Sequence, residues 1–267
     1  MQNIWGLIFT SSKRFEEFII MSNTKSIRLF TLPNALTLAN LVAGAIAIVF
    51  ALNHQYEVSF WLIIVAAVCD FFDGLVARLL HQQSELGVQL DSLADDISFG
   101  LAPAIVMFDI YRSTTSYYAL EQTIMEPLGY VVFIIAAFSA LRLAKFNIDT
   151  TQSAEFEGLP TPANALMLMS LAVLYTDGLV SLYQEHILLI SVAASLLLVS
   201  PIRMFALKFK NFKFADNKLR FGFLLSALCF IIFFSAYSIV AIIVLYIVLS
   251  TLRWIFSSRK GDAEETK

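Results

Sequence analysis

Charged residues are scarce in this sequence, and their scarcity is the first constraint on the class of protein. Only 15% of the 267 residues are Asp, Glu, Lys or Arg, whereas 58% are hydrophobic. In a soluble domain roughly a quarter of all residues are charged, and a domain of this length could not bury so much apolar surface. The mean hydropathy of +0.75 therefore predicts an integral membrane protein. The net charge is only −3, and the sequence shows no strongly basic face. A nucleic acid is therefore not expected as a partner.

Cysteine and histidine are also rare. The two cysteines, Cys69 and Cys229, each lie in an apolar run, and we interpret both as buried small hydrophobic residues. They make neither a disulfide framework nor a metal cluster. No His or Cys stands at the spacing of zinc ligands, which argues against a zinc site. The sequence also lacks internal repeats, low-complexity tracts and Ser/Gly/Pro-rich linkers.

Long apolar runs dominate the rest of the chain. A helix that crosses a bilayer needs about 20 mostly apolar residues. Eight segments meet or approach this length, namely 34–52, 58–80, 88–109, 128–147, 162–180, 187–206, 219–234 and 236–255. The pattern predicts an all-α fold, a polytopic membrane helical bundle of about eight transmembrane helices. The last two segments nearly touch in sequence, so we expect them to form a tight helical hairpin.

The basic residues favour one orientation of these spans. Short cytoplasmic loops are enriched in Lys and Arg. With the eight segments in place, 17 of the 18 basic residues fall on one side, and only Arg112 falls on the other. We therefore expect both termini to face the cytoplasm, in the plasma (inner) membrane.

The spans divide the chain into four expected parts. Residues 1–31 form an N-terminal cytoplasmic or interfacial segment, in which Met21 is a possible true start. Residues 32–206 hold the first six spans, and residues 207–256 form the C-terminal two-helix hairpin. A polar cytoplasmic tail occupies residues 257–267.

Carboxylates interrupt the apolar pattern in two neighbouring spans. Asp70 and Asp73 are three residues apart, and Asp91 and Asp95 are four apart, so each pair lies on one helix face. A short turn around 81–85 makes the two helices antiparallel and can bring both pairs together. Carboxylates at membrane depth repel one another unless cations neutralise them. Mg²⁺ and Mn²⁺ prefer carboxylate oxygens, so the pattern predicts a divalent metal site.

These carboxylates belong to a longer string, D-x2-D-G-x2-A-R-x8-G-x3-D-x3-D, which runs from Asp70 to Asp95. The chain resembles the CDP-alcohol phosphatidyltransferase family, whose signature this string matches without a gap or substitution. The resemblance implies a six-helix catalytic core at 32–206, a homodimer, and two divalent cations, Mg²⁺ or Mn²⁺, held by Asp70, Asp73, Asp91 and Asp95. It further implies that Asp95 is the general base beside a catalytic Asp91, and that the metals bridge the diphosphate of the donor, CDP-diacylglycerol.

Further signature positions are expected to bind CDP and its phosphates. Gly74 and Ala77 are small residues beside the first acidic pair, where a ligand can approach the backbone. Arg78 lies at the cytoplasmic end of its helix, where a guanidinium can hold a phosphate. Gly87 joins this set as a signature residue. The set therefore predicts a phosphate site next to the acidic residues.

A polar stripe on the otherwise apolar first span leaves two interpretations open. Asn34, Thr37 and Asn40 share one helix face. Polar side chains inside a membrane bundle often hold helices together. The family resemblance suggests instead that Asn34 and Thr37 help to bind the nucleotide.

The acceptor is suggested by three more strings, at 91–103, 139–147 and 156–163, which resemble the membrane-embedded family members that use serine. This resemblance implies that L-serine attacks CDP-diacylglycerol to give phosphatidylserine and CMP. Serine is a zwitterion, so its carboxylate needs a cation, and Arg142, Lys145 and Asn147 are the candidate ligands. The two cations could alternatively anchor the helix end or hold a lipid phosphate. Lys145 stands where the family more often has Arg, which keeps the charge but loses bidentate recognition.

Two other functions stay open on the sequence alone. The same chemistry could use glycerol-3-phosphate, inositol phosphate or choline, although Arg142 with Lys145 is a thin basic pocket for a phosphorylated acceptor. From a different class, a cation transporter could use buried carboxylates. A transporter would favour inverted repeats and broken helices in two halves, whereas the acids here are concentrated in one helical hairpin.

Overall fold

The computed structural model describes residues 29–149, 155–205 and 237–265, together with the single positions 223, 226, 227 and 230. The chain divides into two units, residues 1–31 and 32–267, and the description below concerns the second. Most of the expected N-terminal segment, most of the expected span at 219–234, and Cys229 lie outside the described residues. Cys69 is a free thiol that is only partly buried.

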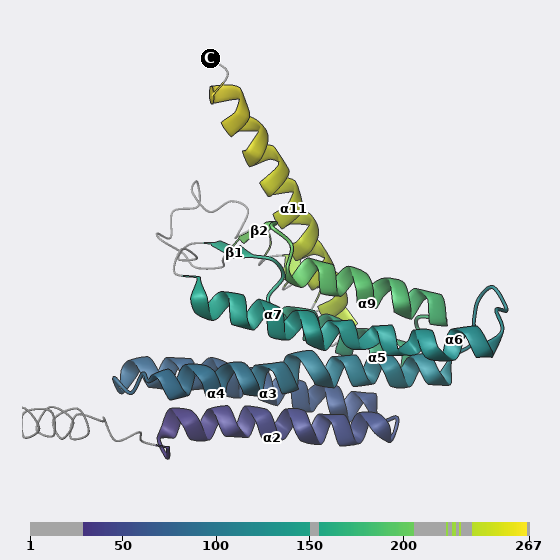
Figure 1. Cartoon of the computed structure of the whole chain (residues 1–267), viewed down its shortest axis with the longest axis horizontal. Coiled ribbons are helices and arrows are strands. Elements are labelled where there is room, and N and C mark those ends of the chain that lie inside the picture. Colours follow the sequence, from purple (N-terminus) through teal and green to yellow (C-terminus); the bar gives the residue numbers. More distant parts are fainter. Residues whose placement is uncertain are drawn as a thin grey trace, which may run out of the picture. The chain divides into compact units, whose positions relative to one another are not determined.

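The first half of the described chain forms two long antiparallel passes followed by a third (Figure 1). Helix α2 (Leu32–Leu52) and helix α3 (Tyr56–Leu79) form a hairpin and pack closely together. A continuous helical course follows, from α4 (Glu85–Asp95) through the wider π-helical turn η1 (Asp96–Leu101) into α5 (Ala102–Ser113).

The second half adds shorter helical passes against the first. Helix α6 (Gln122–Leu128), the 3₁₀ turn η2 (Gly129–Phe133) and helix α7 (Ile134–Ile148) also run on continuously. Helices α8 (Thr161–Thr176) and α9 (Gln184–Leu198) follow. Helix α8 packs against α3, α5 and η1, and α9 packs against α7.

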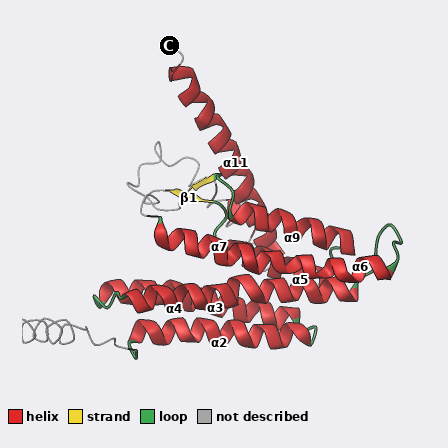
Figure 2. Ribbon diagram, viewed as in Figure 1, coloured by secondary structure: helices red, strands yellow, loops and turns green. Residues whose placement is uncertain are grey.

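Two short strands and a long helix complete the described part. Strands β1 (Glu155–Glu157) and β2 (Arg203–Phe205) pair antiparallel, with Glu157 opposite Arg203. Helix α11 (Ser238–Glu265) has 28 residues and projects away from the other helices (Figure 2).

The expectation of a membrane protein is confirmed at the level of its apolar helices. Four described helical segments are long and apolar enough to cross a bilayer, namely Leu32–Leu52, Tyr56–Leu79, Gln122–Ile148 and Ser238–Phe256. Helices α8 and α9 are apolar but have only 16 and 15 residues. The chain is therefore a mostly helical integral membrane protein, and the described residues do not establish the expected count of eight spans.

Two details of the expected architecture were wrong. The span expected at 187–206 ends at Leu198, because Pro201 cannot continue a helix, and β2 follows it. The prediction of an all-α fold missed the pairing of β1 with β2. Strands of three residues are too short to show the alternation of apolar and polar residues by which a strand is recognised in a sequence. Within the expected polar tail, α11 continues as far as Glu265.

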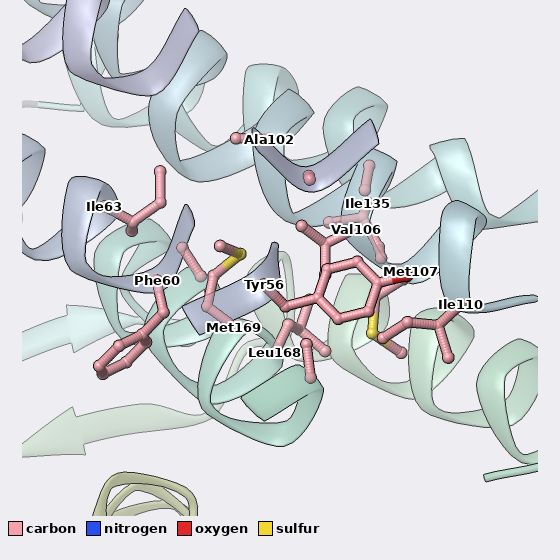
Figure 3. Close-up of a cluster of buried hydrophobic side chains, with 14 of the residues drawn as sticks. Tyr56, Phe60, Ile63, Ala102, Val106, Met107, Ile110, Ile135, Leu168 and Met169 are labelled. Atoms are coloured by element: carbon pink, nitrogen blue, oxygen red, sulfur yellow. The ribbon is translucent and has the colours of Figure 1, made fainter. Parts of the chain in front are cut away.

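The apolar core lies where α3, α5, α7 and α8 meet (Figure 3). Phe60 and Ile63 of α3, Met107 of α5 and Met169 of α8 are all buried in this core. Buried residues recur every three or four positions along α3, so one face of this helix enters the core. Asp70 follows on the same helix about two turns after Ile63, so the core holds the helix that carries the first acidic pair.

Candidate active site

The turn between α3 and α4 brings three carboxylates together. Asp70 of α3 and Asp91 and Asp95 of α4 each offer one oxygen, and these oxygens all lie within 4.8 Å of one another. The turn is short because α4 begins at once after a capping residue. The Ser84 hydroxyl accepts a hydrogen bond from the backbone N–H of Gly87 at 3.0 Å, which satisfies one free donor of the first helical turn.

Helix α2 supplies a neutral hydrogen-bond donor to each acidic pair. The Thr37 hydroxyl donates to Asp73 Oδ2 at 2.5 Å, and the Asn40 amide donates to Asp95 Oδ1 at 2.9 Å. Asp73 is only 5% exposed and Asp95 only 7%. Buried carboxylates need such donors, because their charge loses the solvation of water. The polar stripe of the first span therefore faces the acidic residues directly.

Asn40 is the site residue that our prediction from sequence missed. The sequence placed it on the polar stripe but assigned only Asn34 and Thr37 to the site. The spacing of three residues between Thr37 and Asn40 was the available signal, because it puts both on one face. The acidic residue that each would meet could not be read from that spacing.

Asp95 and Asp96 are adjacent where the π-helical turn η1 begins, and they face different neighbours. Pro103 has no backbone N–H, so the carbonyl four residues earlier lacks its usual helical donor and the helix widens at η1. A Cβ added to Gly100 would lie 2.6 Å from Asp96 Oδ1 and 2.8 Å from Ser139 Oγ. Asp96 is therefore directed toward Ser139 of α7, whereas Asp95 faces Asn40 and the acidic cluster.

The donor set at this cluster fits a hard divalent cation. Asp91 Oδ1 is buried and has no hydrogen-bond partner within the described part of the chain. Three carboxylates so close together repel one another unless a positive charge lies between them. Carboxylate oxygens are the ligands that Mg²⁺ and Mn²⁺ prefer. The fourth expected ligand, Asp73, lies nearly one turn further along α3 than Asp70 and is bonded to Thr37.

A groove of about 690 Å³ opens beside these carboxylates. Asp73 and Asp91 contribute to its wall. The same wall contains all the residues that the sequence predicted for CDP and phosphate binding, namely Asn34, Thr37, Gly74, Ala77, Arg78 and Gly87. The volume is in the range of pockets that hold small-molecule ligands. A Cβ at Gly74 would have no atom within 4 Å, so the space over this glycine is open.

The three residues expected to bind serine lie at the end of α7 and have different partners. Arg142 donates from an Nη atom to the Thr161 hydroxyl at 2.9 Å, and Lys145 Nζ lies 2.8 Å from Glu157 Oε2. Both cations line a second cavity of about 260 Å³. The Asn147 amide instead donates to Ser92 Oγ of α4 at 2.8 Å. Asn147 therefore connects α7 to the acidic helix, and it does not line the second cavity.

Comparison with known proteins places this chain in a family. Residues 30–252 match the CDP-alcohol phosphatidyltransferase family. The chain belongs to this family. Its membership favours phosphatidyl transfer over the cation transport that the sequence had left open, and members of this family generally use a divalent metal.

Three relatives illustrate the similarity, and each is a CDP-diacylglycerol–serine O-phosphatidyltransferase. The protein of Mycobacterium leprae is 39% identical over 158 residues, which cover 56% of this chain and 49% of the relative. That of Helicobacter pylori is 29% identical over 237 residues, covering 85% of this chain and 92% of the relative. That of Methanocaldococcus jannaschii is 31% identical over 176 residues, which cover 66% of this chain and 74% of the relative. The chain thus spans about half the length of the mycobacterial relative.

Proposed function

We propose that this chain transfers the phosphatidyl group of CDP-diacylglycerol to the hydroxyl of L-serine, with phosphatidylserine and CMP as products. The observation that carries the proposal is the groove in which all the expected CDP-binding residues lie beside converging carboxylates. Serine as the acceptor is supported by the activity of the three relatives described above.

The acidic residues divide the chemistry between them. Asp70, Asp73, Asp91 and Asp95 would hold two divalent cations, Mg²⁺ or Mn²⁺, which when bound offset the charge of the diphosphate and of the leaving CMP. Asp95 accepts the proton of the serine hydroxyl as the general base. Asn40 holds Asp95 Oδ1, which leaves the second oxygen to take that proton. The serine oxygen then forms its bond to the phosphorus that carries the lipid, and the bond from that phosphorus to the CMP oxygen breaks.

The donor and the acceptor occupy adjoining spaces. The cytidine diphosphate lies in the large groove, where Arg78 binds a phosphate and the missing side chain of Gly74 leaves room for it. The serine carboxylate binds Arg142 and Lys145 at the end of α7. Phe146 lines both cavities, so the two spaces adjoin.

Release of CMP is the experiment that tests this function. We expect the purified protein in lipid vesicles to release CMP from CDP-diacylglycerol when Mg²⁺ or Mn²⁺ and L-serine are added. Glycerol-3-phosphate, inositol phosphate and choline should be poor acceptors in parallel reactions. Efficient use of glycerol-3-phosphate without any reaction of serine would contradict the acceptor and leave phosphatidyl transfer intact. No CMP with any acceptor would contradict the proposed chemistry.

We further propose eight transmembrane helices, a homodimer, and an active site on the cytoplasmic side of the plasma membrane. The asymmetry of the basic residues supports this orientation, because Arg78, Arg142 and Lys145 all stand at the site's end of their helices. In a variant without Cys69 and Cys229, we expect a cysteine at Asn53 to react with an impermeant reagent added to intact cells.

The matched position for that labelling experiment is Gln83, in the turn between α3 and α4. A cysteine there should react only after the cells are opened, since the turn borders the proposed active site. Labelling of position 83 in intact cells would overturn the orientation and the cytoplasmic site together.

A further inference from the structure

The second cavity carries charges of both signs. Its lining includes Arg142 and Lys145 from α7 and Glu157 from β1, and the remaining side chains are apolar. Its volume of about 260 Å³ suits a small polar molecule and is too small for a nucleotide together with its lipid. Because Phe146 lines both this cavity and the large groove, a molecule bound here lies next to the expected position of the donor.

The backbone around Glu157 holds its carboxylate at this cavity. Glu157 is paired with Arg203 of β2. Two residues later, the backbone N–H of Leu159 donates to the Leu197 carbonyl of α9 at 2.9 Å. Gly158, between them, has a φ of +75°, and a Cβ there would lie 2.9 Å from the carbonyl carbon of Leu198. Only glycine fits this close approach. The β1–β2 strand pair is thus bound tightly to the end of α9, and Glu157 has a defined position.

Lys145 and Glu157 form an ion pair that a ligand can enter. Their charged atoms are 2.8 Å apart, and the side chains remain 51% and 35% exposed. Arg142 Nε is buried and has no hydrogen-bond partner among the described residues. The cavity is therefore lined by a guanidinium that keeps one unused donor, and by an ion pair whose members are both accessible.

A zwitterion matches this arrangement better than any singly charged molecule. Its carboxylate can take the place of Glu157 opposite Lys145, and its ammonium group can take the place of Lys145 opposite Glu157. Each protein charge then keeps a counter-charge, so neither is left unpaired at the partly buried site. A phosphorylated acceptor would instead bring two or more negative charges toward Glu157, which is unfavourable.

We propose that Glu157 determines acceptor specificity by binding the ammonium group, while Arg142 and Lys145 bind the carboxylate of the same molecule. The proposal rests on the proposed function and deepens it. It restricts the acceptor to α-amino acids that carry a hydroxyl on the side chain. It also gives Glu157 a second effect, the exclusion of phosphorylated alcohols.

The test compares acceptors that differ from serine in one group. Glycerate has a hydroxyl in place of the ammonium group, and ethanolamine lacks the carboxylate. In E157Q we expect the KM for serine to rise about tenfold, the low end for a charge-assisted hydrogen bond, because the pair is partly exposed. The preference for serine over glycerate should fall by a similar factor. The preference for serine over ethanolamine should stay unchanged, since both carry the ammonium group.

Matched variants separate binding from support of the fold. R142Q or K145Q should lower the preference for serine over ethanolamine and leave the preference over glycerate unchanged. R203Q neutralises the residue opposite Glu157 in the strand pairing but does not line the cavity, so its selectivity should equal that of the unmodified protein.

Two outcomes would overturn the role of Glu157. One is an equal loss with all three acceptors in E157Q, which would mean that the residue only positions the β1–β2 strand pair. The other is a higher KM for CDP-diacylglycerol alone, which would place a donor phosphate in this cavity. Calorimetric titration of serine in the presence of CMP supplies a readout without turnover, and there E157Q should bind serine about tenfold more weakly. Absence of CMP release by the unmodified protein would contradict the proposed function, while the titration would still decide the role of Glu157.

Discussion

Replacement of Asp95 by Asn should lower turnover by about a thousandfold or more, because the change removes the general base together with a charge of the acidic cluster. The amide keeps the volume of the side chain, and its oxygen can still accept the hydrogen bond from Asn40. We therefore expect the variant to remain folded. CMP release measures the loss, and thermal unfolding in detergent checks the fold. Asn substitutions of Asp70, Asp73 and Asp91 should each remove most of the activity as well.

Asp96 is the matched control for this prediction. It follows Asp95 directly, but the helix turns by about 100° per residue, and its side chain faces Ser139 on α7. D96N should therefore lose much less activity than D95N while it removes the same charge from the same helix. Near-normal turnover in D95N together with a large loss in D96N would contradict the assignment of the base.

Gly44→Ala should damage the fold and the site at the same time. A Cβ at Gly44 would lie 2.7 Å from the Cα of Ser98, closer than such atoms approach in folded proteins. Because the obstacle is backbone, α2 would have to move away from η1. That movement would break the bond from the Ser98 hydroxyl to the Asn40 carbonyl, 3.0 Å long, and would draw Asn40 away from Asp95. We expect a stability loss of about 1–3 kcal/mol, measured as a lower unfolding temperature, and a clear drop in turnover.

Gly74→Ala is the same chemical change, but it should impair substrate binding and leave the stability of the fold unchanged. A Cβ there would meet no atom within 4 Å, so the unfolding temperature should stay that of the unmodified protein. The added methyl group would instead project into the groove and raise the KM for CDP-diacylglycerol. An unchanged unfolding temperature and full activity in Gly44→Ala would disprove the close packing of α2 on η1.

Several expectations from the sequence depended on local pattern alone, and these agree with the structure. The scarcity of charge indicated a membrane protein, and four apolar helices of spanning length are present. The spacing of the aspartates predicted that both pairs would meet across one helical hairpin. Three of the four, Asp70, Asp91 and Asp95, do so, while Asp73 is hydrogen-bonded to Thr37. Helical periodicity depends only on the neighbours of a residue along the chain, so sequence suffices to predict it.

Other features depend on which helices become neighbours, and the sequence pattern does not contain that information. Nothing in the string around Asn40 or Thr37 says that Asn40 will meet Asp95 and that Thr37 will meet Asp73. The directions of Asp95 and Asp96 are similar in this respect. Helix geometry places the two side chains about 100° apart, but the sequence pattern does not say which neighbour each will face.

The amino-acid sequence by itself determined the membrane class, the acidic hairpin and the family signature, because composition and spacing along one helix follow from the chain alone. Only the tertiary structure decided that Glu157 lies opposite Lys145. The two residues are 12 positions apart on different elements, and their meeting depends on the pairing of β1 with β2 and on the close approach of Gly158 to α9. Contacts of that kind follow from the packing of distant segments, so no local periodicity in the chain reveals them.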